Sequence, residues 1–254
     1  MRSSVRAQGI QRAYRSEEIP GSEDCCDLHV PASWCTCNPI VEVGDTVKVG
    51  QKIGEAAGFI SAPVHSSVSG TVVAVEPRMH GTRGSEVMAV VIESDGKNTL
   101  HESVQPHKAL DELTPDEIIE IVKDAGIVGM GGAGFPTCVK LKPAKPVDTI
   151  LLNGCECEPY LTADHKVLLE FADDIIFGLK AILKTTGAEK GIIVIEDNKQ
   201  DAIELMQKKL PISKIWKFLL QEPNTPRALR KLSSSASWTE RFQAAVFRQM
   251  LALS

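Results

Sequence analysis

Hydrophobic and polar residues alternate in short segments through the first part of the chain. Residues 40–54, 60–75 and 87–92 show the period of two that is typical of strands, and residues with turn propensity (Gly, Asp, Ser and Pro) separate them. No comparable helical period interrupts these segments. The pattern predicts a small β-rich module over residues 38–94.

The second part of the chain changes between helical and strand periods. A helix is expected to begin at Thr114 as N-cap with Pro115 in its first position. Buried strands are then expected at 149–152 and 191–196, each followed by a helix. The helices are predicted at 164–186 and at 200–210, the latter capped by Asn198. A strand-helix-strand-helix order is typical of a parallel α/β sheet.

These patterns predict a division of the chain into five segments. They are an irregular lead-in at 1–37, the β module at 38–94, a polar linker at 95–113, an α/β domain at 114–216 and an irregular tail at 217–254. No strand is expected after Leu210, so one edge of the α/β sheet is predicted to be unpaired.

A glycine-rich turn follows the predicted first helix. Gly129, Gly131, Gly132 and Gly134 lie close together, which allows positive φ angles and lets backbone N–H groups approach an anion. Three of them fit the dinucleotide fingerprint, but that fingerprint follows a strand, whereas residues 115–123 have helical spacing. The alternatives are an anion-binding loop and an ordinary flexible turn.

A second candidate site follows the strand at 149–152. Asn153 begins it, and Cys155 and Cys157 alternate with Glu156 and Glu158. Ligands of open α/β sheets bind at the carboxyl ends of the strands, which is where this loop is expected. The two thiols are interpreted as small buried hydrophobic groups.

Composition limits the classes of function. The net charge is −5 with no Lys/Arg cluster, which argues against nucleic acid as a partner. No apolar run approaches the roughly 18 residues needed to span a bilayer, and no N-terminal stretch resembles a signal peptide. The protein is therefore expected in the cytoplasm, reaching a membrane only through partner subunits.

The seven cysteines do not predict a metal site. Cys25, Cys26, Cys35 and Cys37 cluster near the N-terminus, but their spacing differs from that of zinc ribbons and ferredoxin clusters. His65, which lies among serines, is interpreted as a hydrogen-bonded surface residue.

Two resemblances to known families rest on these motifs. Residues 131–137 with Lys140, and residues 153–160, resemble the flavin-binding loops of NADH-oxidising flavoprotein subunits, most closely the C subunit of the Rnf electron-transport complex. Residues 38–94 resemble a lipoyl/biotinyl-type barrel-sandwich, with no modifiable Lys at the hairpin tip over 55–62. The implied fold is a barrel-sandwich module followed by an α/β flavin-binding domain related to the Complex I flavoprotein subunit.

The resemblance implies electron entry. NADH would reduce bound FMN, and electrons would pass to 4Fe-4S clusters and to the other subunits of a membrane-bound complex, on the inner face of the cell membrane. By the resemblance, Gly129, Gly131, Gly132 and Gly134 would hold the FMN phosphate, Lys140 would add a positive charge, and Phe135 could stack on the nucleotide. No catalytic residue is assigned.

The acidic loop is given roles by the same resemblance. Asn153 would contact the flavin, while Glu156 and Glu158 would shape the flavin and nicotinamide side. Cys155 stands where the Complex I flavoproteins carry Asp, so roles transfer less directly to this loop than to the glycine-rich one.

Both ends of the chain have the character of frame-shifted segments. Codons that could encode residues 29–36 and 221–231 can also be read in another frame. The peptides obtained in that frame can resemble the sequence of the C subunit of Rnf. The family's third flavin-contacting segment is then present only out of frame, and its cluster-binding domain is missing. The expectation is a truncated chain that binds FMN weakly or not at all and does not oxidise NADH.

Two rival functions remain open from the sequence. One is a non-catalytic structural fragment whose barrel module docks partner proteins. The other is a Rossmann-type dehydrogenase that uses Gly129, Gly131 and Gly134 for NAD, with Glu156 on the ribose. The final electron acceptor, any ion coupling and the oligomeric state are not predicted.

Overall fold

The computed structural model describes seven stretches of the chain, which form two compact units. The stretches are residues 24–27, 37–79, 86–129, 134–156, 162–210, 216–221 and 239–240. The first unit combines the described residues up to His107 with 121–137, and the second combines 108–120 with the described residues from Cys138 onward. Each unit is described by itself.

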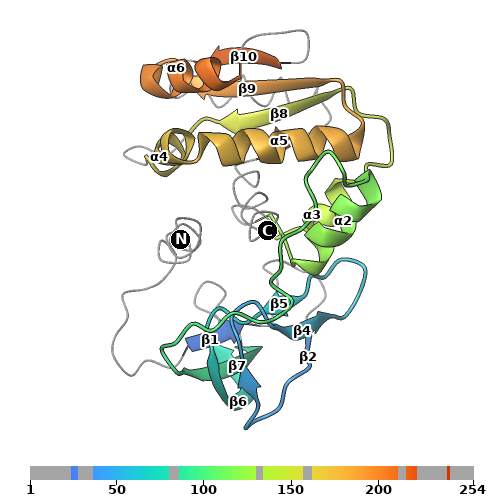
Figure 1. The fold of residues 1–254 in the computed structure, drawn as a ribbon, viewed down its shortest axis with the longest axis vertical. Helices are drawn as coiled ribbons and strands as arrows, with labels where there is room; N and C mark the ends of the chain where they lie inside the picture. Colours follow the sequence, from blue (N-terminus) through green and yellow to red (C-terminus); the bar gives the residue numbers. More distant parts are fainter. Residues whose placement is uncertain are drawn as a thin grey trace. The chain divides into compact units, whose positions relative to one another are not determined.

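The first unit contains two small antiparallel sheets formed by β1 to β7, and Figure 1 labels all of these strands except β3. One sheet has the order β1 (Asp24–Asp27), β7 (Glu86–Ser94), β6 (Gly70–Met79) and β3 (Thr46–Val47). The other has the order β2 (Cys37–Pro39), β4 (Lys52–Ala56) and β5 (Val64–His65). The β-rich module predicted from alternation is confirmed.

Strand β1 corrects the prediction of an irregular segment over residues 1–37. Its four residues pair antiparallel with β7, from Asp24 opposite Ile92 to Asp27 opposite Ala89. A strand this short carries too few residues to show a period of two. It forms because the edge of β7 offers backbone N–H and C=O groups that need partners.

The core of this unit draws apolar side chains from both sheets, as in a sandwich. Its buried members are Cys37, Val41, Val47, Ile53, Ala62, Val68, Val72, Val90 and Ile92. Ile53 and Ile92 are fully buried, and each such side chain contributes about 1.5–3 kcal/mol. The Cys37 thiol donates a hydrogen bond to Ala62 O (2.7 Å), and burial raises its pKa.

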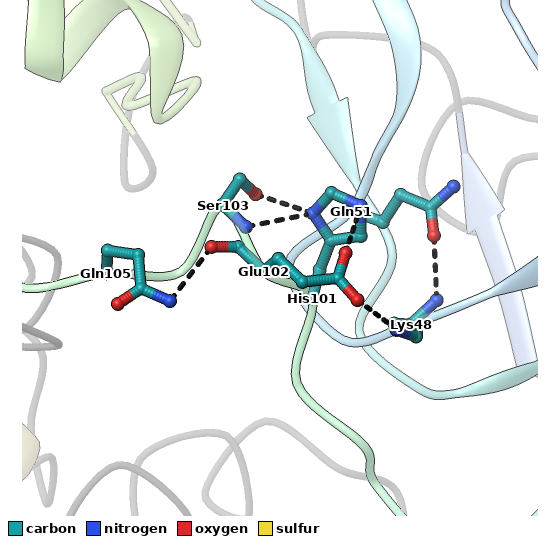
Figure 2. Close-up of polar contacts among 6 residues, drawn as sticks. All are labelled: Lys48, Gln51, His101, Glu102, Ser103 and Gln105. Carbon is teal, nitrogen blue, oxygen red and sulfur yellow. Dashed lines mark hydrogen bonds and ion pairs between the residues drawn. The ribbon is translucent and has the colours of Figure 1, made fainter.

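Residues 95–105, within the predicted linker, run along the first unit and bind to it. The Val49 N–H donates to Thr99 O, and the His101 N–H donates back to Val49 O, both at 2.9 Å. Figure 2 shows the polar side chains beside this pairing, where Lys48 forms an ion pair with Glu102. The Lys48 N–H also donates to Gln51 Oε1 (3.0 Å). These contacts attach the segment to the β module.

Helix α2 (Pro115–Asp124) ends at a close approach to the connection between β4 and β5. Gly126 follows it with φ +69°, and a Cβ there would lie 2.3 Å from Pro63 O. Lys52 Nζ lies 3.8 Å from Asp124 Oδ1, which adds a surface ion pair. Only glycine fits at position 126, because both the angle and the space exclude a side chain.

His65 is half-buried beside this junction, so its interpretation as a surface residue is wrong. Its Nδ1 lies 3.7 Å from the position that a Gly126 Cβ would take. Burial and the Lys52 charge lower the pKa of His65, while Asp124 and Glu55 act in the opposite direction. The imidazole is therefore held neutral.

The second unit contains a parallel sheet with the order β10, β9, β8, β11, of which Figure 1 labels β10, β9 and β8. These strands span Trp216–Gln221, Lys190–Glu196, Thr149–Gly154 and Thr239–Glu240. The predicted parallel sheet is confirmed. The prediction of an unpaired edge after Leu210 is wrong, because β10 pairs with β9. Within the predicted irregular tail at 217–254, the described residues belong to β10 and to β11, which pairs with β8, and the others lie outside the described residues.

Three helices connect the strands of this sheet. They are α4 (Ala163–Glu170), α5 (Ala172–Thr186) and α6 (Gln200–Lys209). Right-handed crossovers place α5 and α6 on the same face of the sheet. Figure 1 shows α5 running along β8, and its apolar side, from Ile175 to Ile182, is buried.

The helix boundaries differ from prediction at two places and agree at a third. The single helix expected at 164–186 breaks at Phe171, whose φ of −121° is not helical. Lys199, rather than Asn198, is the N-cap of α6. Thr114 caps α2 as predicted, because the Glu117 N–H donates to Thr114 Oγ1 (3.3 Å) and the Thr114 N–H donates to Glu117 Oε2 (2.7 Å).

Substitution of Gly126 tests the junction with Pro63. Gly96 has the same φ of +69°, and a Cβ added there would meet nothing within 4 Å, so it serves as the matched control. We expect Gly96→Ala to cost about 1–2 kcal/mol in unfolding free energy from backbone strain alone. Gly126→Ala should cost about 1–3 kcal/mol more, because the new methyl group overpacks the junction. Urea denaturation of both variants measures the difference, and equal losses would contradict the close approach.

The pH dependence of stability tests the burial of His65. Its pKa is lower in the folded state than in the unfolded chain, so protonation favours unfolding. Stability should therefore be fully present above the unfolded pKa of about 6.5 and should fall as the pH drops below it. His65→Gln should flatten this decline, whereas His107→Gln at an exposed site should not. Urea midpoints across this range provide the measurement, and identical slopes in all three proteins would refute the assignment.

Candidate functional site

The glycine-rich loop of the first unit is closed by backbone hydrogen bonds. Val128 and Pro136 form an antiparallel bridge. The Gly129 N–H donates to Phe135 O (3.0 Å), and the Gly134 N–H donates to Gly129 O (3.1 Å). These bonds form a neck that joins the two ends of the loop, and residues 130–133 between those ends lie outside the described residues.

The neck changes what two of the predicted site residues can do. The amides of Gly129 and Gly134 donate to carbonyl oxygens of the loop itself, so their N–H groups already have acceptors within the chain. Gly134 has φ +64°, the left-handed conformation that favours glycine. Gly131 and Gly132 lie outside the described residues, and their contact with a phosphate stays a prediction.

The loop follows helix α2 rather than a strand, as its spacing indicated. The helix ends at Asp124, and only the single bridge at Val128 precedes the glycines. A dinucleotide fingerprint needs a strand in that place. The Rossmann-type alternative therefore lacks its structural context.

Phe135 and Lys140 flank the exit of the loop. Phe135 is half-buried and accepts the Gly129 hydrogen bond through its carbonyl oxygen. Helix α3 (Thr137–Lys140) follows directly, and Lys140 is its half-buried last residue. The Thr137 N–H donates to Ile127 O (2.9 Å), which fixes the start of this short helix to the neck.

The acidic loop of the second unit begins with a buried amide side chain. Asn153 is 6% exposed, and its Oδ1 accepts a hydrogen bond from the Cys155 N–H (3.1 Å). Within the described part of the chain, its Nδ2 group donates to no acceptor. A buried donor without a partner costs about 1–3 kcal/mol, so such a group usually has a water or ligand as its partner.

Glu156 serves as the N-terminal cap of helix α4. The Asp164 N–H donates to Glu156 Oε1 (2.8 Å), and the His165 N–H lies 3.3 Å from Oε2. Thr162 occupies the N-cap position without a side-chain hydrogen bond, so the carboxylate from upstream replaces it. The structure thus gives Glu156 a positioning contact that the sequence did not indicate. Glu158 lies outside the described residues.

The Cys155 side chain is part of the apolar core, as predicted. It is 3% exposed and packs with Leu151 and Val194, with Ile192 alongside. Cys157 lies outside the described residues. The thiol of Cys155 therefore fills space in the sheet core.

Glu196 is a buried acidic residue that sequence analysis did not single out. It is the last residue of β9 and is 6% exposed. Burial raises the pKa of its carboxyl, Lys199 opposes this shift, and Glu156 adds to it. The available signal was an acidic residue that ends an otherwise apolar strand, directly beside the strand that carries Asn153.

A second polar contact joins α4 to α6. His165 Nε2 lies 2.8 Å from Asp201 Oδ1, and this hydrogen bond lowers the pKa of Asp201. Asp201 also accepts from the Ala202 N–H (2.8 Å) in the first turn of α6. The cap from Glu156 and this pair together fix the start of both helices near the acidic loop.

Neither a metal centre nor a membrane span is present in the part of the chain that the structure describes. These residues contain no group of three or more His, Cys, Asp or Glu side chains placed to hold a metal ion. Their helices are all too short or too polar to cross a membrane.

Two family models match the chain. One, described as the RnfC barrel sandwich hybrid domain, matches residues 28–97. The other, described as the Nuo51 FMN-binding domain, matches residues 122–219. The two matches confirm the predicted fold class.

Curated relatives match across both domains. The C subunit of the Na(+)-translocating ferredoxin:NAD(+) oxidoreductase complex of Acetobacterium woodii is 53% identical over 185 residues, which cover 72% of this chain and 41% of the relative. The C subunit of the ion-translocating oxidoreductase complex of Pasteurella multocida is 38% identical over 175 residues, 68% of this chain and 21% of the relative. The chain thus spans about two fifths or less of the length of these relatives.

Similarity to solved structures is weaker. An NAD+-reducing [NiFe]-hydrogenase in the H2-reduced state gives a TM-score of 0.40 with 18% identity, over 61% of this chain and 36% of that one. The family assignment therefore rests on the two domain matches and on sequence identity. With a barrel sandwich hybrid domain followed by a Nuo51-type FMN-binding domain, the chain belongs to the RnfC family, the C subunits of ion-translocating oxidoreductase complexes.

Proposed function

We propose that this chain takes part in electron entry into a membrane-bound redox complex, with NADH as donor and FMN as the first acceptor. The matched FMN-binding domain and the names of the relatives, which include ferredoxin:NAD(+) oxidoreductase complexes, support this proposal. The chain would work with the other subunits of the complex on the inner face of the membrane. Iron–sulfur clusters that receive the electrons would lie in other parts of the assembly.

The buried amide of Asn153 is the observation that carries the proposal. Its Nδ2 donors meet no acceptor in the described part of the chain, and the residue lies near the end of strand β8 at the carboxyl edge of the sheet. That edge is where open α/β sheets bind ligands. A flavin ring, with carbonyl oxygens along one side, supplies the acceptor that Asn153 lacks.

The glycine-rich loop is the candidate binding site for the phosphate of FMN. We assign the phosphate to the loop segment that contains Gly131 and Gly132, because the amides of Gly129 and Gly134 already close the neck. Lys140 would add a positive charge directly after the loop. Phe135, half-buried at the neck, would pack against the nucleotide.

FMN, when bound, accepts two electrons from NADH together and releases them one at a time. The chain's own residues would bind and orient it. Asn153 would donate to a ring carbonyl oxygen, and Glu156 would position its loop through the cap of α4 rather than by direct contact. Glu158 is assigned to the nicotinamide side. No residue of the chain is given a proton-transfer role.

Titration with FMN tests the proposal and the role of the loop. Of the two outcomes expected from the sequence, weak binding or none, we propose weak binding. The unsubstituted chain should quench FMN fluorescence saturably, more weakly than a full-length relative. Gly134→Ala should weaken binding at least about tenfold, because the strained residue distorts the neck. Gly96→Ala has a similar positive φ in an open position and should leave affinity unchanged. Absence of saturable quenching by the unsubstituted chain would contradict the proposal, and equal affinities of all three proteins would remove the loop from the site.

The ligand's phosphate allows the role of Lys140 to be isolated. Lys140→Gln should weaken FMN binding by roughly tenfold, since hydrogen bonds to charged groups contribute about 1.5–3 kcal/mol. Binding of riboflavin, which lacks the phosphate, should not change. Lys142→Gln is the matched control, because Lys142 Nζ lies 3.9 Å from Asp116 Oδ1 in an exposed surface pair. A loss of affinity for both ligands would indicate a structural role for Lys140 instead.

A further inference from the structure

The carboxyl group of Glu196 has no hydrogen-bond partner within the described part of the chain, although the residue is only 6% exposed. Its backbone carbonyl oxygen accepts a hydrogen bond from the Lys199 N–H (3.1 Å), but this bond does not involve the carboxyl group. A buried carboxyl without a partner destabilises the fold. Among the described residues, this side chain is therefore a candidate for binding a ligand.

The strand register places Glu196 on the same face of the sheet as Asn153. Asn153 lies opposite Val194 in the parallel pairing of β8 with β9. Side chains two residues apart share a face, so Glu196 follows Val194 on the side that carries Asn153. Both residues lie at the ends of their strands, which puts two buried polar side chains at one carboxyl edge.

The helices occupy the opposite face at this edge. A Cβ on Gly154 would lie 3.4 Å from Leu168 Cδ1 of α4 and 3.6 Å from Ile195 Cγ1. Gly154 and Ile195 point away from the side of Asn153 and Glu196, because they occupy the alternate positions of their strands. The two polar groups therefore do not face α4.

Burial of the Glu196 carboxyl favours its neutral form. Burial raises its pKa, and the negative charges of Glu156 and Asp197 act in the same direction against Lys199. The Glu156 carboxylate is itself occupied by the N-terminus of α4. A neutral carboxyl offers one donor and one acceptor side by side, which suits an uncharged ligand edge rather than a cation.

We propose that Glu196 and Asn153 together bind the imide edge of the flavin ring, where an N–H group lies between two carbonyl oxygens. Glu196 accepts from the flavin N3–H and donates to one adjacent carbonyl oxygen, while the Asn153 amide donates to the other. This proposal rests on the proposed function and adds to it a specificity-determining residue that no family motif in the sequence indicates.

The test compares Glu196→Leu and Glu196→Gln with the unsubstituted chain. In Glu196→Leu, affinity for FMN should fall by roughly fivefold to tenfold, the effect of lost neutral hydrogen bonds. Glu196→Gln keeps one donor and one acceptor and should stay within about threefold. Glu204→Gln, on the exposed side of α6, is the control and should bind as the unsubstituted chain does.

Two further measurements separate ligand binding from a structural role. Without FMN, Glu196→Leu should be at least as stable to urea as the unsubstituted chain, because an unsatisfied buried carboxyl has been removed. N3-methyl-FMN lacks the N3–H group, so the unsubstituted chain should bind it more weakly than FMN. The Leu variant should bind both flavins alike. The comparison of the two flavins on the unsubstituted chain needs no folded variant.

The outcomes distinguish this inference from the proposed function. Saturable FMN binding that is unchanged in Glu196→Leu, equal affinity of the unsubstituted chain for both flavins, or a loss of ligand-free stability in the Leu variant overturns the role of Glu196 alone. If the unsubstituted chain does not bind FMN at all, the proposed function fails and the inference fails with it.

Discussion

The parallel pairing of β8 with β9 is the constraint on which the second unit depends. Both strands are apolar through most of their length, so they must be covered, and the polar side chains that they bury lie where the strands end. Their register fixes Asn153 beside Val194 and so sets which side chains share a face with Glu196. A slip by one residue would turn this edge toward the helices. The register of β8 with β9 therefore determines both the packing of the apolar side chains and the positions of Asn153 and Glu196.

Much of this arrangement follows from local sequence patterns. The apolar runs at 149–152 and 191–196 predict the two central strands, and Thr114 with Pro115 predicts the start of α2, because these signals act within a few residues. The elements that were missed depend on distant partners. Strands β1 and β10 exist because β7 and β9 offer unpaired edges, and their own residues show no strand period.

The candidate site shows the same division between local and distant causes. Glycine spacing predicts an anion-binding loop, but the neck bonds that use the Gly129 and Gly134 amides appear only in three dimensions. Likewise, Glu156 looks like a ligand contact in the sequence, whereas its carboxylate caps a helix that begins only at Ala163. Glu196 belongs to no motif, and only its burial beside the end of β8 identifies it.

The neck of the glycine-rich loop also determines how free energy is divided between folding and binding. Bonds from Gly129 to Phe135 and from Gly134 to Gly129 join the loop ends through groups of the chain itself. The entropy lost in bringing those ends together is thus part of folding, and an arriving anion does not have to supply it. Residues such as Val128 and Pro136, which need touch no ligand, can consequently alter affinity through preorganisation alone.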